Sequence, residues 1–133
     1  MNHRLSLESI QSAILTIPAE FLNSPQYESE ALNAALGTRV ILKIETLNPI
    51  RSFKGRGAAH FVASLEKTAK LVCGSAGNFG QAMAYASRAK GIDLTVFASF
   101  NANPLKLERM RALGAKVILA GEDFDAAKLE AKR

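Results

Sequence analysis

After residue 50, short apolar runs alternate with longer segments in which apolar residues recur every three or four positions. The short runs predict buried β-strands at Leu71–Cys73, Leu94–Ala98 and Val117–Leu119. The longer segments predict helices over 78–90 and 105–113, the second opened by Asn103 and Pro104. A further helix is predicted to begin after Asp123, whose side chain is a good N-cap.

The predicted strands recur with a fixed spacing. Leu71, Leu94 and Val117 lie 23 residues apart, and so do the helix-ending glycines Gly91 and Gly114. A repeated strand–helix unit with buried strands favours parallel pairing through right-handed crossovers. We therefore predict an α/β fold with a doubly wound parallel sheet in three layers (α/β/α). Because the last helix has neither a glycine stop nor a following strand, we expect this chain to be an incomplete fragment of a longer protein.

Residues 1–50 follow a different pattern. Apolar residues at helical spacing predict a short helix around Leu7–Ile14, and Tyr27–Leu36 is predicted to be a helix that ends at Gly37. Alternation over 40–44 predicts a strand. Ser52 is the expected N-cap of a helix whose apolar stripe runs to Ala69. We therefore divide the chain at residue 50, into a segment 1–50 and a regular α/β unit 51–133.

Composition excludes several classes of protein. Apolar residues make up 48% of the chain and charged residues 22%, which is ordinary for a globular protein. No apolar run approaches the ~18 residues of a membrane span. The net charge of +5 is scattered rather than gathered with aromatics, which disfavours nucleic-acid binding. The single cysteine, Cys73, and the lack of an apolar leader after Met1 favour the cytoplasm.

A glycine-rich turn is predicted between the strand at 71–73 and the helix at 78–90. Gly74, Gly77 and Gly80 follow a G-x-x-G-x-x-G spacing, which matches neither the dinucleotide fingerprint nor the phosphate loop of nucleotide hydrolases. Backbone N–H groups at a helix N-terminus bind anions. The turn is thus a candidate anion site. The alternative is that its glycines only allow a tight connection between the strand and the helix.

Lys54 is a second candidate, near the predicted start of a helix and flanked by Phe53 and Gly55. A lysine buried at the positive end of a helix has a lowered pKa and a nucleophilic amine, as Schiff-base chemistry requires. A solvated surface lysine is the alternative. His60 has no partner at metal-ligand spacing, so no metal site is expected.

The two candidate segments together resemble the fold-type II pyridoxal-phosphate enzymes, which include threonine and serine dehydratases, serine racemase and the tryptophan synthase β chain. Residues 52–58, Ser-Phe-Lys-Gly-Arg-Gly-Ala, resemble the S-F-K-x-R-G-A motif of the cofactor lysine. Residues 75–81, Ser-Ala-Gly-Asn-Phe-Gly-Gln, are similar to the substrate loop S-S-G-N-H-[GA]-Q. Segments 103–115 and 121–127 also resemble this family, so the likeness covers nearly the whole chain. It implies a fragment of a two-domain enzyme, in which 1–50 belong to the larger domain and 51–133 to a truncated smaller domain.

The resemblance implies a role for each matching residue. Lys54 would bind pyridoxal phosphate covalently and act as the base at the substrate Cα, with Phe53 beside the cofactor. Asn78 would donate a hydrogen bond to the cofactor's ring oxygen. The substrate carboxylate would be held by the loop residues Ser75, Ala76, Gly77, Asn78 and Phe79.

Three residues depart from the family pattern. Ala76 replaces a frequent serine, Phe79 a common histidine, and Arg51 a small glycine that often precedes the motif serine. The family's phosphate-binding glycine loop and the partner of the pyridine nitrogen come later in the chain than residue 133. We therefore expect the 133-residue chain to be inactive alone.

The activity implied by the resemblance is removal of water from threonine or serine, giving a 2-oxo acid and ammonia. Racemisation and β-replacement share its early steps and stay open. The rivals from other classes are a non-catalytic α/β module that binds an amino acid or another anion and a nucleotide-binding fold. The expected partners are an amino-acid substrate and a second copy of the chain in a homodimer, with no nucleic acid and no membrane.

Overall fold

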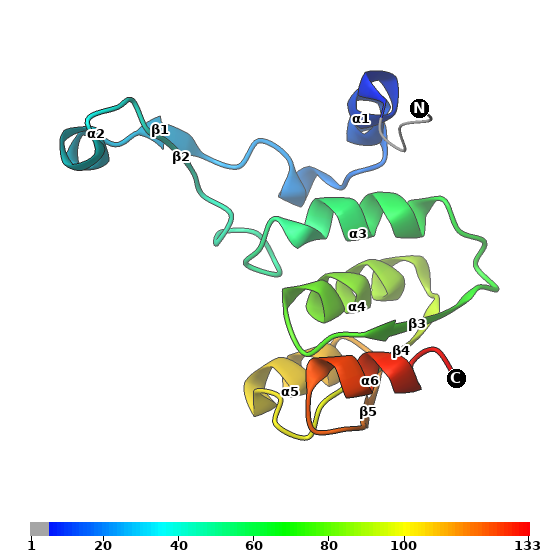
Figure 1. Ribbon diagram of the computed structural model, residues 1–133. Helices are drawn as coiled ribbons and strands as arrows, with labels where there is room; N and C mark the ends of the chain where they lie inside the picture. Colours follow the sequence, from blue (N-terminus) through cyan, green and yellow to red (C-terminus); the bar gives the residue numbers. More distant parts are fainter. Residues whose placement is uncertain (1–5) are drawn as a thin grey trace.

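The computed structural model describes residues 6–133, so the Met1–Arg4 stretch considered for targeting lies outside it. Its central element is a three-stranded parallel sheet in the order β3–β4–β5 (Figure 1). The strands are β3 (Lys70–Gly74), β4 (Asp93–Ala98) and β5 (Lys116–Leu119). Leu71 pairs with Leu94, and Val96 with Val117, so the 23-residue spacing is the register of the sheet. The positions of the three predicted strands are confirmed. Only β4 carries buried residues, whereas those of β3 and β5 are half-buried or exposed, so the expected burial of these two strands is wrong within this chain.

Helices cover both faces of this sheet, as the doubly wound prediction requires (Figure 1). Helices α4 (Asn78–Lys90) and α5 (Pro104–Ala112) pack on β4 and β5, where their apolar sides meet the buried Val96. Helix α6 (Phe124–Glu130) packs against β3 and β4, and Lys128 lies over Gly74. Helix α6 therefore lies on the face of the sheet opposite to α4 and α5.

Helix α3 (Lys54–Ala63) forms an outer layer along α4. The predicted apolar stripe to Ala69 is too long, because the helix ends at Ala63 with Ser64 as its C-cap. Lys90, the last residue of α4, donates its ammonium protons to the carbonyl oxygens of Val62 (3.0 Å), Ala63 (2.6 Å) and Leu65. A cation at the carbonyl oxygens of a helix C-terminus stabilises the helix end.

Lys90→Met should weaken this junction between α3 and α4. The variant keeps an apolar stem of similar length but removes the ammonium donor to the three carbonyl oxygens. One hydrogen bond from a charged group contributes about 1.5–3 kcal/mol, and the three made by this single, partly exposed ammonium are not additive. We therefore expect the free energy of unfolding to fall by about 2 kcal/mol. Urea unfolding measures the loss, with the exposed Arg88→Met on the same helix as the control. Equal midpoints for the two variants would contradict the assignment.

The N-terminal part contains α1 (Leu7–Ser12), the 3-10 helices η1 (Ala13–Leu15) and η2 (Ala19–Phe21), and a small antiparallel sheet with one helix. That sheet pairs β1 (Gln26–Glu28) with β2 (Ile41–Lys43), and α2 (Glu30–Leu36) lies between them in the chain. In Figure 1 this unit projects to the left, away from the three-stranded sheet.

The helix predicted over Tyr27–Leu36 is wrong in its first turn. Tyr27 pairs with Leu42 in the small sheet, and the side chain of Ser29 accepts a hydrogen bond from the N–H of Leu32. A serine N-cap places the helix start after it, so α2 begins at Glu30. Gly37 ends the helix in the left-handed conformation (φ 64°), as predicted.

The boundary at residue 50 stays a prediction, and the two parts share a core. Phe21 is only 1% exposed, and its ring meets Tyr85 of α4 edge-on, with centroids 5.4 Å apart. A Cβ on Gly55 would lie 2.2 Å from the same ring. Residue 55 must therefore lack a side chain for α3 to pack on the N-terminal segment.

Candidate active site

Lys54 and Asn78, the cofactor-binding residues predicted from the sequence, lie at one end of the molecule. Helices α3 and α4 run side by side with their C-terminal ends joined by Lys90, so their first residues, Lys54 and Asn78, lie at the other end. That end is also where the parallel strands terminate (Figure 1). In open α/β sheets, ligands bind beyond the carboxyl ends of the strands.

The loop before Lys54 is organised by Asn48, which is only 9% exposed. Its side-chain oxygen accepts hydrogen bonds from the N–H groups of Ile50 and Ser52, both at 3.2 Å. Its side-chain nitrogen donates to the carbonyl oxygen of Ser52 at 3.0 Å. Asparagine commonly closes such turns through its side chain.

An ion pair ties this loop to α3. Arg56 donates from Nη1 to a carboxylate oxygen of Glu45 at 2.7 Å, and Asn48 donates to the other oxygen at 3.2 Å. Burial alone would raise the pKa of Glu45, but the hydrogen bond and charge of Arg56 outweigh it and hold that pKa below its usual value. Glu45 is therefore ionised at neutral pH and fixes the entry to the helix.

Lys54 is the first residue of α3 and its side chain is exposed, so burial within this chain does not activate it. Its ammonium lies 5.2 Å from the centroid of the Phe53 ring. Ser52 is buried, and its hydroxyl oxygen accepts a hydrogen bond from the N–H of Lys54 at 3.3 Å. Ser52 thus orients Lys54, although the helix N-cap position belongs to Phe53 rather than to Ser52 as predicted.

The glycine-rich turn at 74–80 leaves two backbone N–H groups available as hydrogen-bond donors at the start of α4. The Ser75 hydroxyl is turned inward and accepts hydrogen bonds from the N–H groups of Gly77 (3.3 Å) and Gly80 (3.0 Å). The N–H groups of Asn78 and Phe79 have no acceptor within residues 6–133. Both side chains are exposed, with Phe79 beside Asn78 at the helix tip. This is the geometry of an anion site at a helix N-terminus.

Gly80 permits the close approach on which this turn depends. A Cβ there would lie 2.6 Å from the Met110 sulfur and 2.9 Å from the Ser75 carbonyl oxygen. Met110 is fully buried, so neither neighbour can move freely. A side chain at position 80 would therefore displace Ser75 and the amides that it orders.

Cys73 lies close to this turn but is poorly suited to nucleophilic chemistry. Burial raises the pKa of its thiol to about 11. The thiolate is the reactive form, so its population at neutral pH is small. Its packing against the apolar core supports the interpretation of Cys73 as a core residue.

The pH dependence of alkylation tests this point. At pH 8 we expect iodoacetamide to modify Cys73 about 10²-fold more slowly in the native protein than in urea, where the thiol has its ordinary pKa of about 8.5. The native rate should go on rising between pH 9 and pH 10, whereas the unfolded rate levels off. Mass spectrometry of the Cys73 peptide measures both rates. A native rate that levels off below pH 9 would contradict the raised pKa.

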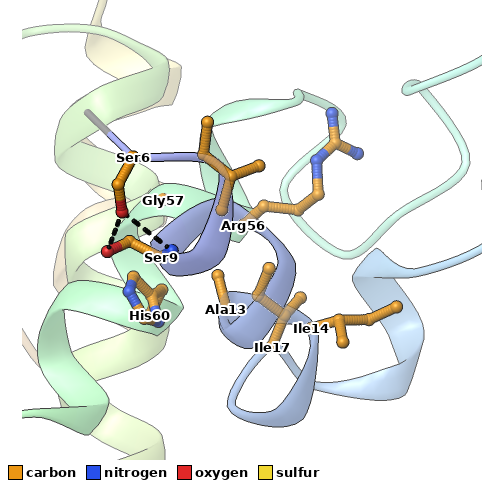
Figure 2. Close-up of a pocket in the computed structure, with 9 residues that line it drawn as sticks. Ser6, Ser9, Ala13, Ile14, Ile17, Arg56, Gly57 and His60 are labelled. Carbon is orange, nitrogen blue, oxygen red and sulfur yellow. Dashed lines mark hydrogen bonds between the residues drawn. The ribbon is translucent and has the colours of Figure 1, made fainter.

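A cavity of about 560 Å³ lies between α1, η1 and α3, away from the glycine-rich turn. Figure 2 shows that its lining includes the apolar side chains of Ala13, Ile14 and Ile17 together with Arg56 and His60 of α3. His60 Nδ1 and the Thr16 hydroxyl are 2.6 Å apart. None of the residues predicted to bind a substrate lines this cavity.

Two further features bear on the kind of site. Within residues 6–133, no group of three or more His, Cys, Asp or Glu side chains is arranged to hold a metal ion. No helix in this same part of the chain combines the length and the apolar character needed to cross a membrane.

Comparison with known proteins identifies the relatives of this arrangement. The sequence profile of the family described as "Pyridoxal-phosphate dependent enzyme" matches residues 18–133. Human L-serine dehydratase/L-threonine deaminase is 40% identical over 108 residues, which are 80% of this chain and 33% of that protein.

Solved structures extend the likeness to the fold. A pyridoxal 5'-phosphate-dependent aspartate racemase has a TM-score of 0.88 at 27% identity, covering 99% of this chain and 43% of its own. The processed form of threonine deaminase isoform 2 from Solanum lycopersicum has a TM-score of 0.79 at 26% identity, covering 96% of this chain and 40% of its own. The chain spans between 19% and 40% of the length of the first curated relatives that it matches.

Proposed function

Because the chain belongs to the pyridoxal-phosphate dependent enzyme family, we propose that it is part of a threonine or serine dehydratase that forms a 2-oxo acid and ammonia. This proposal rests on the position of Lys54 at the same end as the backbone N–H groups of Asn78 and Phe79, which have no acceptor within residues 6–133. It places an amine and an anion site at the same end of two parallel helices. The dehydratase relatives, up to 40% identical, support the choice of reaction.

The residues of this chain fit the family's cofactor. Lys54 presents an accessible primary amine, which can hold pyridoxal phosphate covalently, and Phe53 offers an aromatic surface next to it. The Asn78 side chain is exposed at the tip of α4, where it can donate to an oxygen of the cofactor ring. When bound, pyridoxal phosphate supplies an electron sink for the substrate Cα.

The other tasks fall to the protein. The Asn78 and Phe79 N–H groups and the N-terminal dipole of α4 bind and orient the substrate carboxylate. Ser75 acts indirectly, because its hydroxyl oxygen holds the turn in place through the N–H groups of Gly77 and Gly80. Lys54 Nζ takes the proton from the substrate Cα. A positioned base of this kind accelerates proton transfer by about 10²–10⁴-fold.

A racemase is the second candidate. The structure with the TM-score of 0.88 is an aspartate racemase, and proton removal from Cα is the first chemical step in either reaction. A racemase returns the proton to the opposite face, whereas a dehydratase expels the β-hydroxyl group. The two activities therefore differ in product and not in the early role of Lys54.

The experiment follows product formation by the cofactor-loaded full-length protein. With L-threonine or L-serine we expect a 2-oxo acid and ammonia in equal amounts. If serine or aspartate loses optical activity and no 2-oxo acid forms, the protein is a racemase and the dehydratase proposal is wrong. Neither product from any of these amino acids would favour the non-catalytic binding module.

Three expectations about the whole protein stay proposals. We propose that it forms a homodimer, that it is located in the cytoplasm, and that residues 1–133 alone lack turnover. The phosphate of the cofactor has no cradle among the residues assigned above. Misplacement of a reacting group by ~1 Å lowers a rate by about 10²-fold, so a cofactor held through Lys54 alone is not expected to support turnover.

A further inference from the structure

Helix α5 contacts both loops of the candidate site, through two consecutive residues. Arg109 donates from Nη2 to the carbonyl oxygen of Pro49 at 2.7 Å, in the loop that leads to Lys54. Met110, the next residue, is fully buried, and its sulfur lies 2.6 Å from the point that a Cβ on Gly80 would occupy, in the glycine-rich turn. Helix α5 therefore bridges the loop that carries the amine and the turn that forms the anion site.

The contact from Arg109 is the one hydrogen bond that ties residues 48–52 to another part of the fold, among the residues that the structure describes. The other hydrogen bonds of this loop join partners within residues 45–56. They fix the shape of the loop but not its place relative to α4. Ile50 is buried in the core, and this apolar packing is non-directional. Arg109 therefore supplies the directional contact between the loop and the rest of the fold.

The backbone at Arg51 shows that the loop needs such support. Arg51 has φ +55°, in the left-handed region that favours glycine. A non-glycine residue in this region costs free energy, and it persists only where its surroundings fix the conformation. Pro49, the acceptor of the Arg109 hydrogen bond, lies two residues before Arg51. Release of that bond would let the strained turn relax and would move the start of α3.

We propose that Arg109 is a positioning residue, which holds the loop of Lys54 in place relative to the backbone N–H groups of Asn78 and Phe79. This inference rests on the proposed function, in which Lys54 Nζ takes the Cα proton of a substrate whose carboxylate is bound by those N–H groups. Arg109 acts on the reaction only through the carbonyl oxygen of Pro49, to which it donates.

The carboxylate site does not depend on Arg109. Its turn is ordered by the Ser75 hydroxyl, which accepts hydrogen bonds from the N–H groups of Gly77 and Gly80. Loss of Arg109 should therefore displace the amine of Lys54 and leave the binding of the carboxylate intact. In kinetic terms, kcat falls while KM stays nearly constant, because only the proton transfer is affected.

Three variants of the cofactor-loaded full-length protein test the proposal. Arg109→Met keeps an apolar stem and removes the donors, and Arg109→Lys restores one charged donor. Arg111→Met is the control, because Arg111 is exposed and both arginines lie in the last turn of α5. Each methionine variant thus loses one cation near the negative end of the same helix.

Amide hydrogen exchange, followed by mass spectrometry, measures whether the loop is released. In Arg109→Met, we expect the N–H groups of residues 50–52 to exchange about tenfold faster than in the unmodified protein, since a segment that opens locally exchanges without global unfolding. Exchange in α4 should stay unchanged, and Arg111→Met should match the unmodified protein throughout. Exchange needs no catalysis, so the result does not depend on which reaction the protein catalyses. Equal exchange of residues 50–52 in the two methionine variants would overturn the proposal.

Steady-state rates with L-threonine measure the consequence for the reaction. In Arg109→Met, kcat should fall about tenfold or more with a KM changed by less than about threefold, and Arg109→Lys should recover at least about a third of the original kcat. An unchanged kcat despite faster exchange, or a raised KM at constant kcat, would also overturn the proposal. If the unmodified protein forms no 2-oxo acid, the proposed function is wrong, and the exchange comparison alone decides whether Arg109 holds the loop.

Discussion

Lys54→Ala in the full-length protein is expected to reduce the rate of 2-oxo acid formation by at least about 10²–10⁴-fold, the contribution of a positioned base. The variant also loses the only amine at the start of α3. Because the side chain is exposed and makes no hydrogen bond or ion pair within residues 6–133, the free energy of unfolding should change by less than about 0.5 kcal/mol.

The control for this prediction is Lys67→Ala, which removes an exposed lysine from the loop after α3. It should leave both the rate and the unfolding free energy unchanged. Steady-state assays and urea unfolding of the three proteins provide the measurements. If the Lys54→Ala protein keeps more than a tenth of the original rate, Lys54 is not the base that removes the Cα proton.

Asn48→Ala is expected to have the second-largest effect, on stability and on rate together. It deletes the acceptor for the N–H groups of Ile50 and Ser52 and the donor to the Ser52 carbonyl oxygen, all in a buried turn. Each buried group left unpaired costs about 1–3 kcal/mol, so we expect a total loss of about 3 kcal/mol. Displacing Lys54 by ~1 Å would lower the rate by about 10²-fold.

Asn101→Ala serves as the matched control. Asn101 is exposed and makes a single side-chain hydrogen bond, to the Glu122 carbonyl oxygen at 3.0 Å. Its loss should cost no more than about 1 kcal/mol and leave the rate unchanged. If Asn48→Ala is no less stable and no slower than Asn101→Ala, then Asn48 does not set the position of Lys54.

The regular α/β half of the fold could be predicted from the sequence because local signals there agree with one another. The run Leu94–Ala98 has the pattern of a buried strand, and the helix over 78–90 has the predicted bounds of α4. Asp123 caps α6 as predicted, accepting a hydrogen bond from the Ala126 N–H at 2.8 Å. Consistency among pattern, caps and turns makes such a segment predictable.

The parts that were missed depend on contacts distant in the sequence. Tyr27 belongs to a strand because it pairs with Leu42, which no local pattern around residue 27 indicates. The end of α3 is set by Lys90, a residue 27 positions after Ala63. A propensity for helix is a weak signal, and tertiary pairing overrides it.

The candidate site shows the same division. The motif lysine and the glycine-rich turn could be found from residue types and spacing, and the likeness to a family gave their expected roles. The support around them could not. The hydrogen bonds of Asn48 depend on three-dimensional packing, and a single asparagine carries no spacing signal. Arg51 was noticed only as a departure, and its left-handed backbone explains why glycine suits that position.

The identity of the cofactor lysine is the central claim, and one measurement tests it directly. The full-length protein is loaded with pyridoxal phosphate, reduced with borohydride to make the linkage permanent, digested, and mapped by mass spectrometry. The account predicts a pyridoxyl group on Lys54, in a peptide that also contains Phe53. A label on Lys43 or Lys67 in place of Lys54 would contradict it.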